Sequence, residues 1–149
     1  GNVQKLWHAT KRQCNLGDDG RRLRICADTE CSLCQIIRTS YQKNLINHCP
    51  PRFGVGIYTS TTSSKKQVNF KVQGQYGVLF VYGWMDILND VAVGQPYRTR
   101  KADTGRISAP KGYDSVCGLP GSGLKFDETC VYDDDAIRPR YLILYDADE

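Results

Sequence analysis

The chain has 149 residues, of which 40% are hydrophobic and 24% are charged, and its net charge is +4. This composition is typical of a globular protein with a sizeable core and excludes a disordered chain. No apolar run reaches the roughly 20 residues that a membrane-spanning helix needs. Residues 1–4 lack the basic and apolar layout of a signal peptide. We expect one domain over residues 1–149, without membrane contact.

The first elements in the chain are a short strand and a helix. Leu6–Thr10 is apolar and predicts a strand that carries His8, a residue that on its own more often has a structural role. A polar segment with glycines follows. Ser32–Asn44 predicts a helix, with Asp28 or Thr29 as its cap. Its apolar residues recur at helical spacing: Leu33, Ile36, Ile37 and Tyr41.

Four cysteines cluster between the strand and the first turn of the helix, with the spacing C-x11-C-x4-C-x2-C. A structural zinc site is the favoured interpretation, because four thiolates close the coordination shell of the metal. Disulfides, as in a secreted protein, and unlinked buried thiols are the alternatives. The expected ligands are Cys14, Cys26, Cys31 and Cys34. Three further cysteines, Cys49, Cys117 and Cys130, are dispersed and look like core residues.

The central stretch Arg52–Phe70 combines glycines, a short strand and a polar turn. Gly54 and Gly56 give room for a ligand or a positive φ, and Ile57-Tyr58 reads as a strand. Hydroxyl residues follow, and a helix is expected from Ser64 to about Val72. Taken alone, this pattern favours a surface hairpin with a buried tyrosine.

The second half of the chain reads mainly as strands. Strands are expected at Gly77–Tyr82, Ile87–Val93, Tyr113–Cys117, Phe126–Tyr132 and Tyr141–Tyr145, with a turn at Ala136–Pro139. Because strands outnumber helices in mixed order, the sequence predicts an α+β fold with a mostly antiparallel sheet and few helices.

A basic run lies between the expected strands. The simplest interpretation is a solvated loop, and the alternative is contact with phosphate or nucleic acid. Its members are Arg98, Arg100, Lys101 and Arg106.

Three distant segments together resemble a known family. They are WHAT at residues 7–10, GIYTSTTSSK at residues 56–65 and ETCVY at residues 128–132. They are similar to the W-H-G-[ST], G-I-Y…S-K and E-Y-I-V-Y motifs of the poly(ADP-ribose) polymerase catalytic domain, a diphtheria-toxin-like ADP-ribosyltransferase. K-G-Y-D-S-V at residues 111–116 and Tyr141-Leu142 also resemble segments of that family. Short fungal members with a cysteine-rich insertion, here at about residues 14–34, look most similar.

The resemblance implies a split β-sheet of the ADP-ribosyltransferase type and a His-Tyr-Glu triad formed by His8, Tyr58 and Glu128. It implies an enzyme that cleaves NAD+ between ribose and nicotinamide and transfers ADP-ribose to a macromolecular acceptor. NAD+ would be the substrate, held by His8, Ala9, Thr10, Tyr58, Ser64 and Phe70. The sequence departs from the family where Ala9 replaces glycine, where Lys66 replaces a serine and where Phe70 falls one residue late.

The residue types fit this chemistry independently. Positive charge develops on the ribose as the glycosidic bond breaks, and a carboxylate stabilises it. Two alternatives stay open: an NAD+ glycohydrolase that uses water as acceptor, and a zinc-bearing binding module whose triad is vestigial.

The expected acceptor is protein or nucleic acid. We expect a monomer in the cytoplasm or nucleus, with secretion as the alternative.

Overall fold

The computed structural model describes residues 1–45, 52–63, 84–121 and 123–143. Its strands are β1 (Val3–Lys11), β2 (Ile57–Thr59), β3 (Trp84–Ala92), β4 (Pro96–Thr99), β5 (Ser115–Gly118), β6 (Glu128–Val131) and β7 (Ile137–Ile143). Its helices are α1 (Ser32–Thr39) and the 3₁₀ turns η1 (Lys43–Leu45) and η2 (Asp134–Ala136). The described residues confirm the α+β class with few helices. None of their helices is long and apolar enough to cross a membrane.

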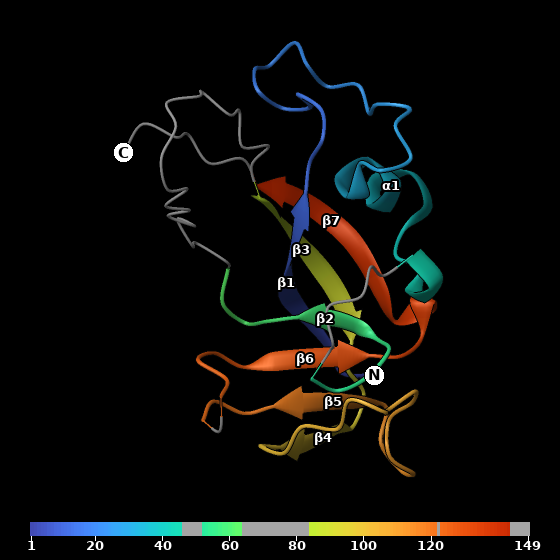
Figure 1. The fold of residues 1–149 in the computed structure, drawn as a ribbon, viewed down its shortest axis with the longest axis vertical. Coiled ribbons are helices and arrows are strands. Elements are labelled where there is room, and N and C mark those ends of the chain that lie inside the picture. Colours follow the sequence, from blue (N-terminus) through green and yellow to red (C-terminus); the bar gives the residue numbers. More distant parts are fainter. Residues whose placement is uncertain (46–51, 64–83, 122, 144–149) are drawn as a thin grey trace, which may run out of the picture.

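The strands form two sheets (Figure 1). One sheet has the order β1-β3-β7 and is antiparallel throughout. The other has the order β2-β6-β5-β4, in which only β4 and β5 are parallel. This agrees with the mostly antiparallel arrangement that the sequence predicts.

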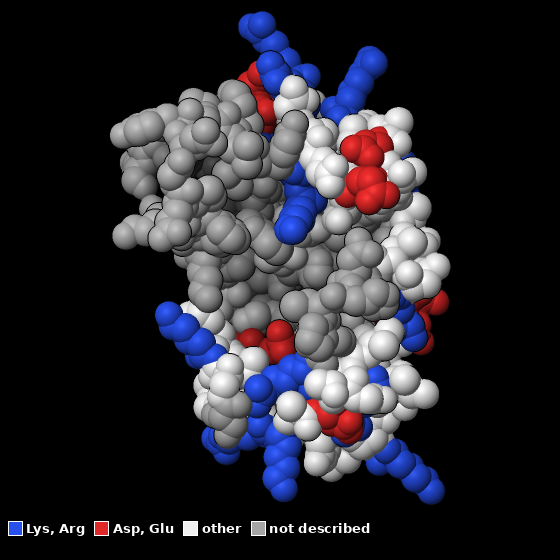
Figure 2. All heavy atoms as spheres, in the orientation of Figure 1, with Lys and Arg blue, Asp and Glu red and all other residues white. Residues whose placement is uncertain are grey.

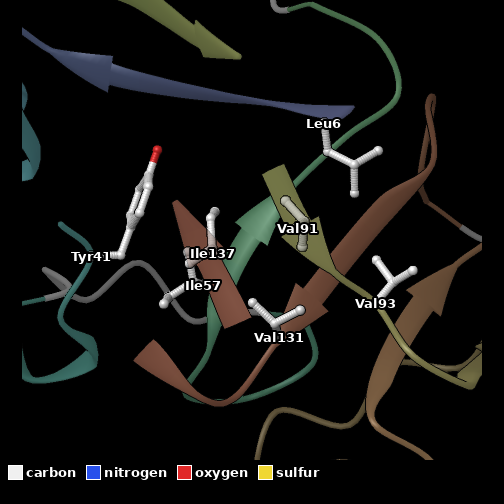
Figure 3. Packing of buried hydrophobic residues seen from close by; sticks show 7 residues of the cluster. All are labelled: Leu6, Tyr41, Ile57, Val91, Val93, Val131 and Ile137. Atoms are coloured by element: carbon white, nitrogen blue, oxygen red, sulfur yellow. The ribbon is translucent and has the colours of Figure 1, made fainter. Parts of the chain in front are cut away.

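The two sheets meet where β1 passes the end of β2. The amide N of Trp7 donates to the carbonyl O of Ser60 at 2.8 Å, and the amide N of Ser60 donates to the carbonyl O of Trp7 at 2.9 Å. A core of β-branched and other apolar residues fills the space between the sheets, because strands turn alternate side chains toward each face. Figure 3 shows its members: Leu6, Tyr41, Ile57, Val91, Val93, Val131 and Ile137.

The predicted turn at Ala136–Pro139 is wrong, because residues 137–139 belong to β7. Ile137 is fully buried, which favours a strand. Pro139 is tolerated because β7 is an edge strand and the register of its partner shifts between Leu88 and Asn89. The basic run was also expected to be loop alone, but Arg98 lies in the edge strand β4.

The predicted helix is shorter than expected. It ends at Thr39 because Ser40 adopts a left-handed φ of 62°. Neither Asp28 nor Thr29 caps it; the N-cap is Cys31, which makes no side-chain cap bond. Asp28 instead accepts a hydrogen bond from the amide N of Glu30.

The remaining expected strands are present with shifted ends, as β1, β3, β5, β6 and β7. The expected helix at residues 64–72, the strand at residues 77–82 and Cys49 lie outside the described residues.

Candidate functional site

Three polar residues come from three neighbouring strands. His8 lies on β1, Tyr58 on β2 and Glu128 on β6. Tyr58 pairs with Cys130, and Glu128 precedes Cys130 by two positions on the same strand. Since residues two apart on a strand share a face, Tyr58 and Glu128 lie on the same face of the β2-β6 pair. The sheet junction at Trp7 and Ser60 brings the His8 side chain to the backbone of Tyr58.

His8 is fixed by two contacts. Its Nδ1 lies 2.8 Å from the carbonyl O of Tyr58. Its ring also meets the ring of Tyr41 edge-on, with 5.0 Å between centroids. Burial lowers the pKa of His8, so the imidazole is neutral at pH 7. In that state Nδ1–H donates to the carbonyl, and Nε2 is left as an acceptor.

Tyr58 is held by its own loop. Its hydroxyl donates to the carbonyl O of Gly54 at 2.7 Å and accepts from the amide N of Phe53 at 2.9 Å. Burial raises the pKa of Tyr58, with the Cys130 thiol as the next cause, so the phenol stays protonated. The tyrosine hydroxyl therefore has a structural role, and the half-buried ring is the part that a ligand could contact.

Glu128 is half-buried, and burial raises its pKa. The charge of Arg52 opposes this rise, while that of Asp127 adds to it. No described residue donates a hydrogen bond to the Glu128 carboxylate, in contrast to Asp127, which accepts from the hydroxyls of Ser60 and Thr61. The Glu128 oxygens therefore keep their capacity to accept a hydrogen bond from a ligand hydroxyl.

The other residues expected to bind NAD+ have different placements. Ala9 and Thr10 follow His8 on β1, opposite Asp86 and Met85 of β3. Thr10 is buried and Ala9 is half-buried. Ser64 and Phe70 lie outside the described residues.

The two glycines of the central stretch are needed for packing within the protein. Gly54 has a φ of 77°, and an added Cβ would lie 1.7 Å from the carbonyl O of Arg106. A Cβ at Gly56 would lie 2.3 Å from Cys130 Sγ. The space beside Gly54 and Gly56, which we expected a ligand to occupy, is therefore filled by the loop around Arg106 and by β6.

The four clustered cysteines converge although they span 21 residues of a loop-rich segment. Their sulfur atoms all lie within 4.8 Å of one another. Cys14 Sγ is 3.5 Å from Cys34 Sγ and 3.8 Å from Cys31 Sγ, and all four thiols are free. The structure therefore has no disulfide among these four cysteines, contrary to the disulfide alternative. The group can hold a metal ion.

Backbone amides and apolar residues surround this cluster. The amide N of Gln13 lies 3.3 Å from Cys31 Sγ, and that of Cys26 lies 3.4 Å from Cys34 Sγ. Such N–H contacts favour thiolate. The pKa of Cys31 is lowered by its hydrogen bonds although burial raises it, whereas burial raises the pKa of Cys14 and Cys34. Leu16, Leu33, Met85 and Ile87 pack around the cluster.

Sequence reasoning missed two residues of the site. Tyr41 was interpreted as an apolar residue of the predicted helix, yet it contacts His8. Arg52 is the first residue of the central stretch, and its charge acts on Glu128. Its place in that stretch was the available signal, but Glu128 lies 76 positions further along the chain.

In comparisons with known proteins, no family model and no curated protein matches this chain.

Proposed function

We propose that this protein is an ADP-ribosyltransferase, with an ADP-ribosyltransferase-like fold, that uses NAD+ as its substrate. One arrangement supports the proposal: the His8 imidazole bonds to the backbone of Tyr58, and Glu128 lies on the same face of the adjoining strand. This reaction needs a neutral imidazole, a phenol ring and a carboxylate that can accept a hydrogen bond from the substrate.

The reaction breaks the bond between C1 of the ribose and the ring nitrogen of nicotinamide. The bonding electrons leave with nicotinamide, and positive charge develops on the ribose. The acceptor forms the new bond to C1 and releases a proton. A carboxylate beside the ribose stabilises the charge and orients the ribose hydroxyls.

Each residue has a role in this proposal. Glu128 accepts a hydrogen bond from a ribose hydroxyl, for which its oxygens have capacity. The Nε2 of His8 accepts from a hydroxyl of the second ribose and positions it. The ring of Tyr58 stacks against nicotinamide, and the backbone of Ala9 and Thr10 holds the carboxamide. Ser64 and Phe70, which lie outside the described residues, are the further NAD+-binding residues that the resemblance implies.

We also propose that the cysteine cluster holds zinc in a structural role. Four thiolates at a Zn–S distance of about 2.3 Å in a tetrahedron have sulfurs about 3.8 Å apart. The separations of 3.5 and 3.8 Å match this geometry. Because all four positions are protein ligands, the metal has no open position for substrate and stabilises the fold.

The proposed function is tested by incubating the protein with NAD+ labelled in its adenylate part, together with cell extract. We expect nicotinamide release and transfer of the label to macromolecules. Glu128→Gln, which keeps the shape of the side chain, should lower the rate at least 100-fold while NAD+ still binds, because a developing charge loses its counter-charge. Glu30→Gln makes the same change at an exposed position and should keep full activity.

The other outcomes separate the alternatives. Label that stays as free ADP-ribose supports an NAD+ glycohydrolase. Tight NAD+ binding without any nicotinamide release supports a binding module. Full activity in Glu128→Gln would show that Glu128 does not have the assigned role.

A further inference from the structure

Four cations surround the end of β6 at which Glu128 lies. We call Arg52, Arg100, Lys101 and Lys125 the basic rim. A terminal nitrogen of Arg52 donates to the carbonyl O of Arg100 at 2.9 Å, and Arg100 Nε donates to the carbonyl O of Pro120 at 3.3 Å. These bonds tie Arg52 to Arg100, and Arg100 to the loop that leads into β6.

The strand register places the rest of the rim at the same end of the sheet. Glu128 pairs with Gly118, and Gly118 pairs with Thr99, the residue that precedes Arg100 and Lys101. The end of β4 is therefore two strand spacings, roughly 10 Å, from Glu128. In Figure 2, Lys and Arg side chains gather over the part of the molecule that β4, β5 and β6 form.

The lysines of the rim have no ion-pair partner among the described residues. Lys101 and Lys125 are exposed, and neither forms an ion pair with a described residue. Two arginines near the cysteine cluster differ, since Arg12 pairs with Asp18 and Arg22 pairs with Asp19. The two lysines of the rim are therefore available to an anionic partner.

An exposed aromatic ring lies within the rim. Phe126 is 44% exposed and stands two residues before Glu128. Lys125 Nζ is 5.3 Å from the centre of its ring. Cations beside an exposed aromatic ring are the pattern that binds single-stranded nucleic acid, because phosphates meet the cations and a base stacks on the ring.

We propose that single-stranded nucleic acid is the macromolecular acceptor, with its phosphates on the basic rim and one base on Phe126. This inference rests on the proposed transferase function. In the transfer step, nicotinamide leaves C1 of the ribose with the bonding electrons, and an oxygen or nitrogen of the strand bonds to C1. The proton of that nucleophile passes to Glu128 and then to water. An acidic protein segment would meet the same cations but has no base to place on Phe126.

Binding is measured first, because it does not require catalysis. The probes are fluorescent single-stranded DNA and RNA of about 12 nucleotides, and anisotropy is followed from about 50 to 200 mM salt. The double variant Lys101→Ala/Lys125→Ala should weaken binding about tenfold and reduce the salt slope by about 1.4, or about 0.7 per lost phosphate contact. Phe126→Ala should weaken it about tenfold, and Phe126→Trp should retain it.

The matched control is Arg21→Ala/Lys111→Ala, which removes two charges at exposed positions away from the rim. It should change the affinity less than about twofold. Absence of binding at low salt, or equal losses in the two double variants, would overturn the proposal.

Transfer is measured next, with labelled NAD+ and the same strands. The expected result is label on the strand that nuclease releases and protease does not. Label on protein alone would overturn the nucleic-acid proposal and leave the proposed transferase standing. Absence of nicotinamide release under any condition would instead reject the proposed function, while the binding experiment would still decide whether the rim holds nucleic acid.

Discussion

Glu128 has a role in the proposed chemistry, and burial raises its pKa above the ordinary value of a glutamate. Tyr41 makes two contacts: its ring packs against His8, and its hydroxyl donates a hydrogen bond to Asn89 in the core. At the scale of single residues, the candidate site therefore depends on side chains whose environment is set by neighbours far away in the sequence.

The raised pKa of Glu128 makes stability depend on pH. Between its unfolded-state and folded-state pKa the folded protein binds more protons, so wild-type stability falls as pH rises through this window. Glu128→Gln removes this titration. We expect the melting temperature of the variant relative to wild type to rise from about pH 4 to about pH 7. Scanning fluorimetry in matched buffers measures it; Glu30→Gln is the control, and a difference that is independent of pH would contradict the prediction.

Tyr41→Phe tests the buried hydrogen bond beside His8. The Tyr41 hydroxyl donates to Asn89 Oδ1 at 2.9 Å, and the Asn89 amide nitrogen donates to the carbonyl groups of Leu6 and Ile87. Without the hydroxyl, a buried oxygen loses its donor, which costs about 1–2 kcal/mol. Urea unfolding measures the loss. Tyr141→Phe, at an exposed tyrosine, should change stability by less than about 0.5 kcal/mol, and equal effects of the two variants would be evidence against this assignment.

At the scale of elements, α1 is too short to be stable by itself. It has eight residues, its N-cap Cys31 makes no side-chain cap bond, and isolated helices of this length are marginal. Leu33 and Cys34 are buried in the cluster that the cysteines form with β3. The proposed metal therefore holds the helix against the sheet.

Metal removal should destabilise the protein at this element. We expect a chelator, or Cys34→Ser, to lower stability by about 3 kcal/mol and the melting temperature by about 10 °C, because the folding free energy then lacks metal binding. Elemental analysis should find one zinc per chain in the wild type. Cys117→Ser, outside the cluster, should keep both zinc and stability. Metal-free wild-type protein with an unchanged melting temperature would count against the zinc site.

At the scale of the whole molecule, the candidate site lies where two sheets meet. β1 belongs to one sheet, and β2 and β6 belong to the other. The paired backbone bonds between Trp7 and Ser60 hold them together at the level of His8 and Tyr58. Both sheets contribute to the shared apolar core that Figure 3 shows, and Leu6 of that core is the neighbour of Trp7 in the chain.

Ser60→Pro should weaken the junction. Proline has no N–H to donate to the carbonyl O of Trp7, so we expect a loss of about 2–3 kcal/mol and faster amide exchange at Trp7. Urea unfolding and hydrogen exchange measure these effects. Ser60→Ala keeps the backbone bond and loses only the hydroxyl contacts with Asp127 and Thr62, so its loss should be about 1 kcal/mol. Similar losses in both variants would argue that the backbone pair is unimportant.

Local pattern in the sequence was enough to predict the α+β class, the strands around His8, Tyr58 and Glu128, and four cysteines spaced for a metal. These features follow from side-chain periodicity and from spacing over a few residues. The edge strand β4 and the strand that contains Pro139 were missed. Whether a strand lies at the edge of a sheet depends on the order of all the strands, which a local pattern does not show.

Only the tertiary structure decided which distant groups meet. It set the bond from His8 to the backbone of Tyr58, the ring of Tyr41 against His8 and the charge of Arg52 near Glu128. It also showed that Gly54 and Gly56 make room for Arg106 and Cys130. The physical reason is that these contacts depend on strand register and on the crossing of two sheets, which no local pattern encodes.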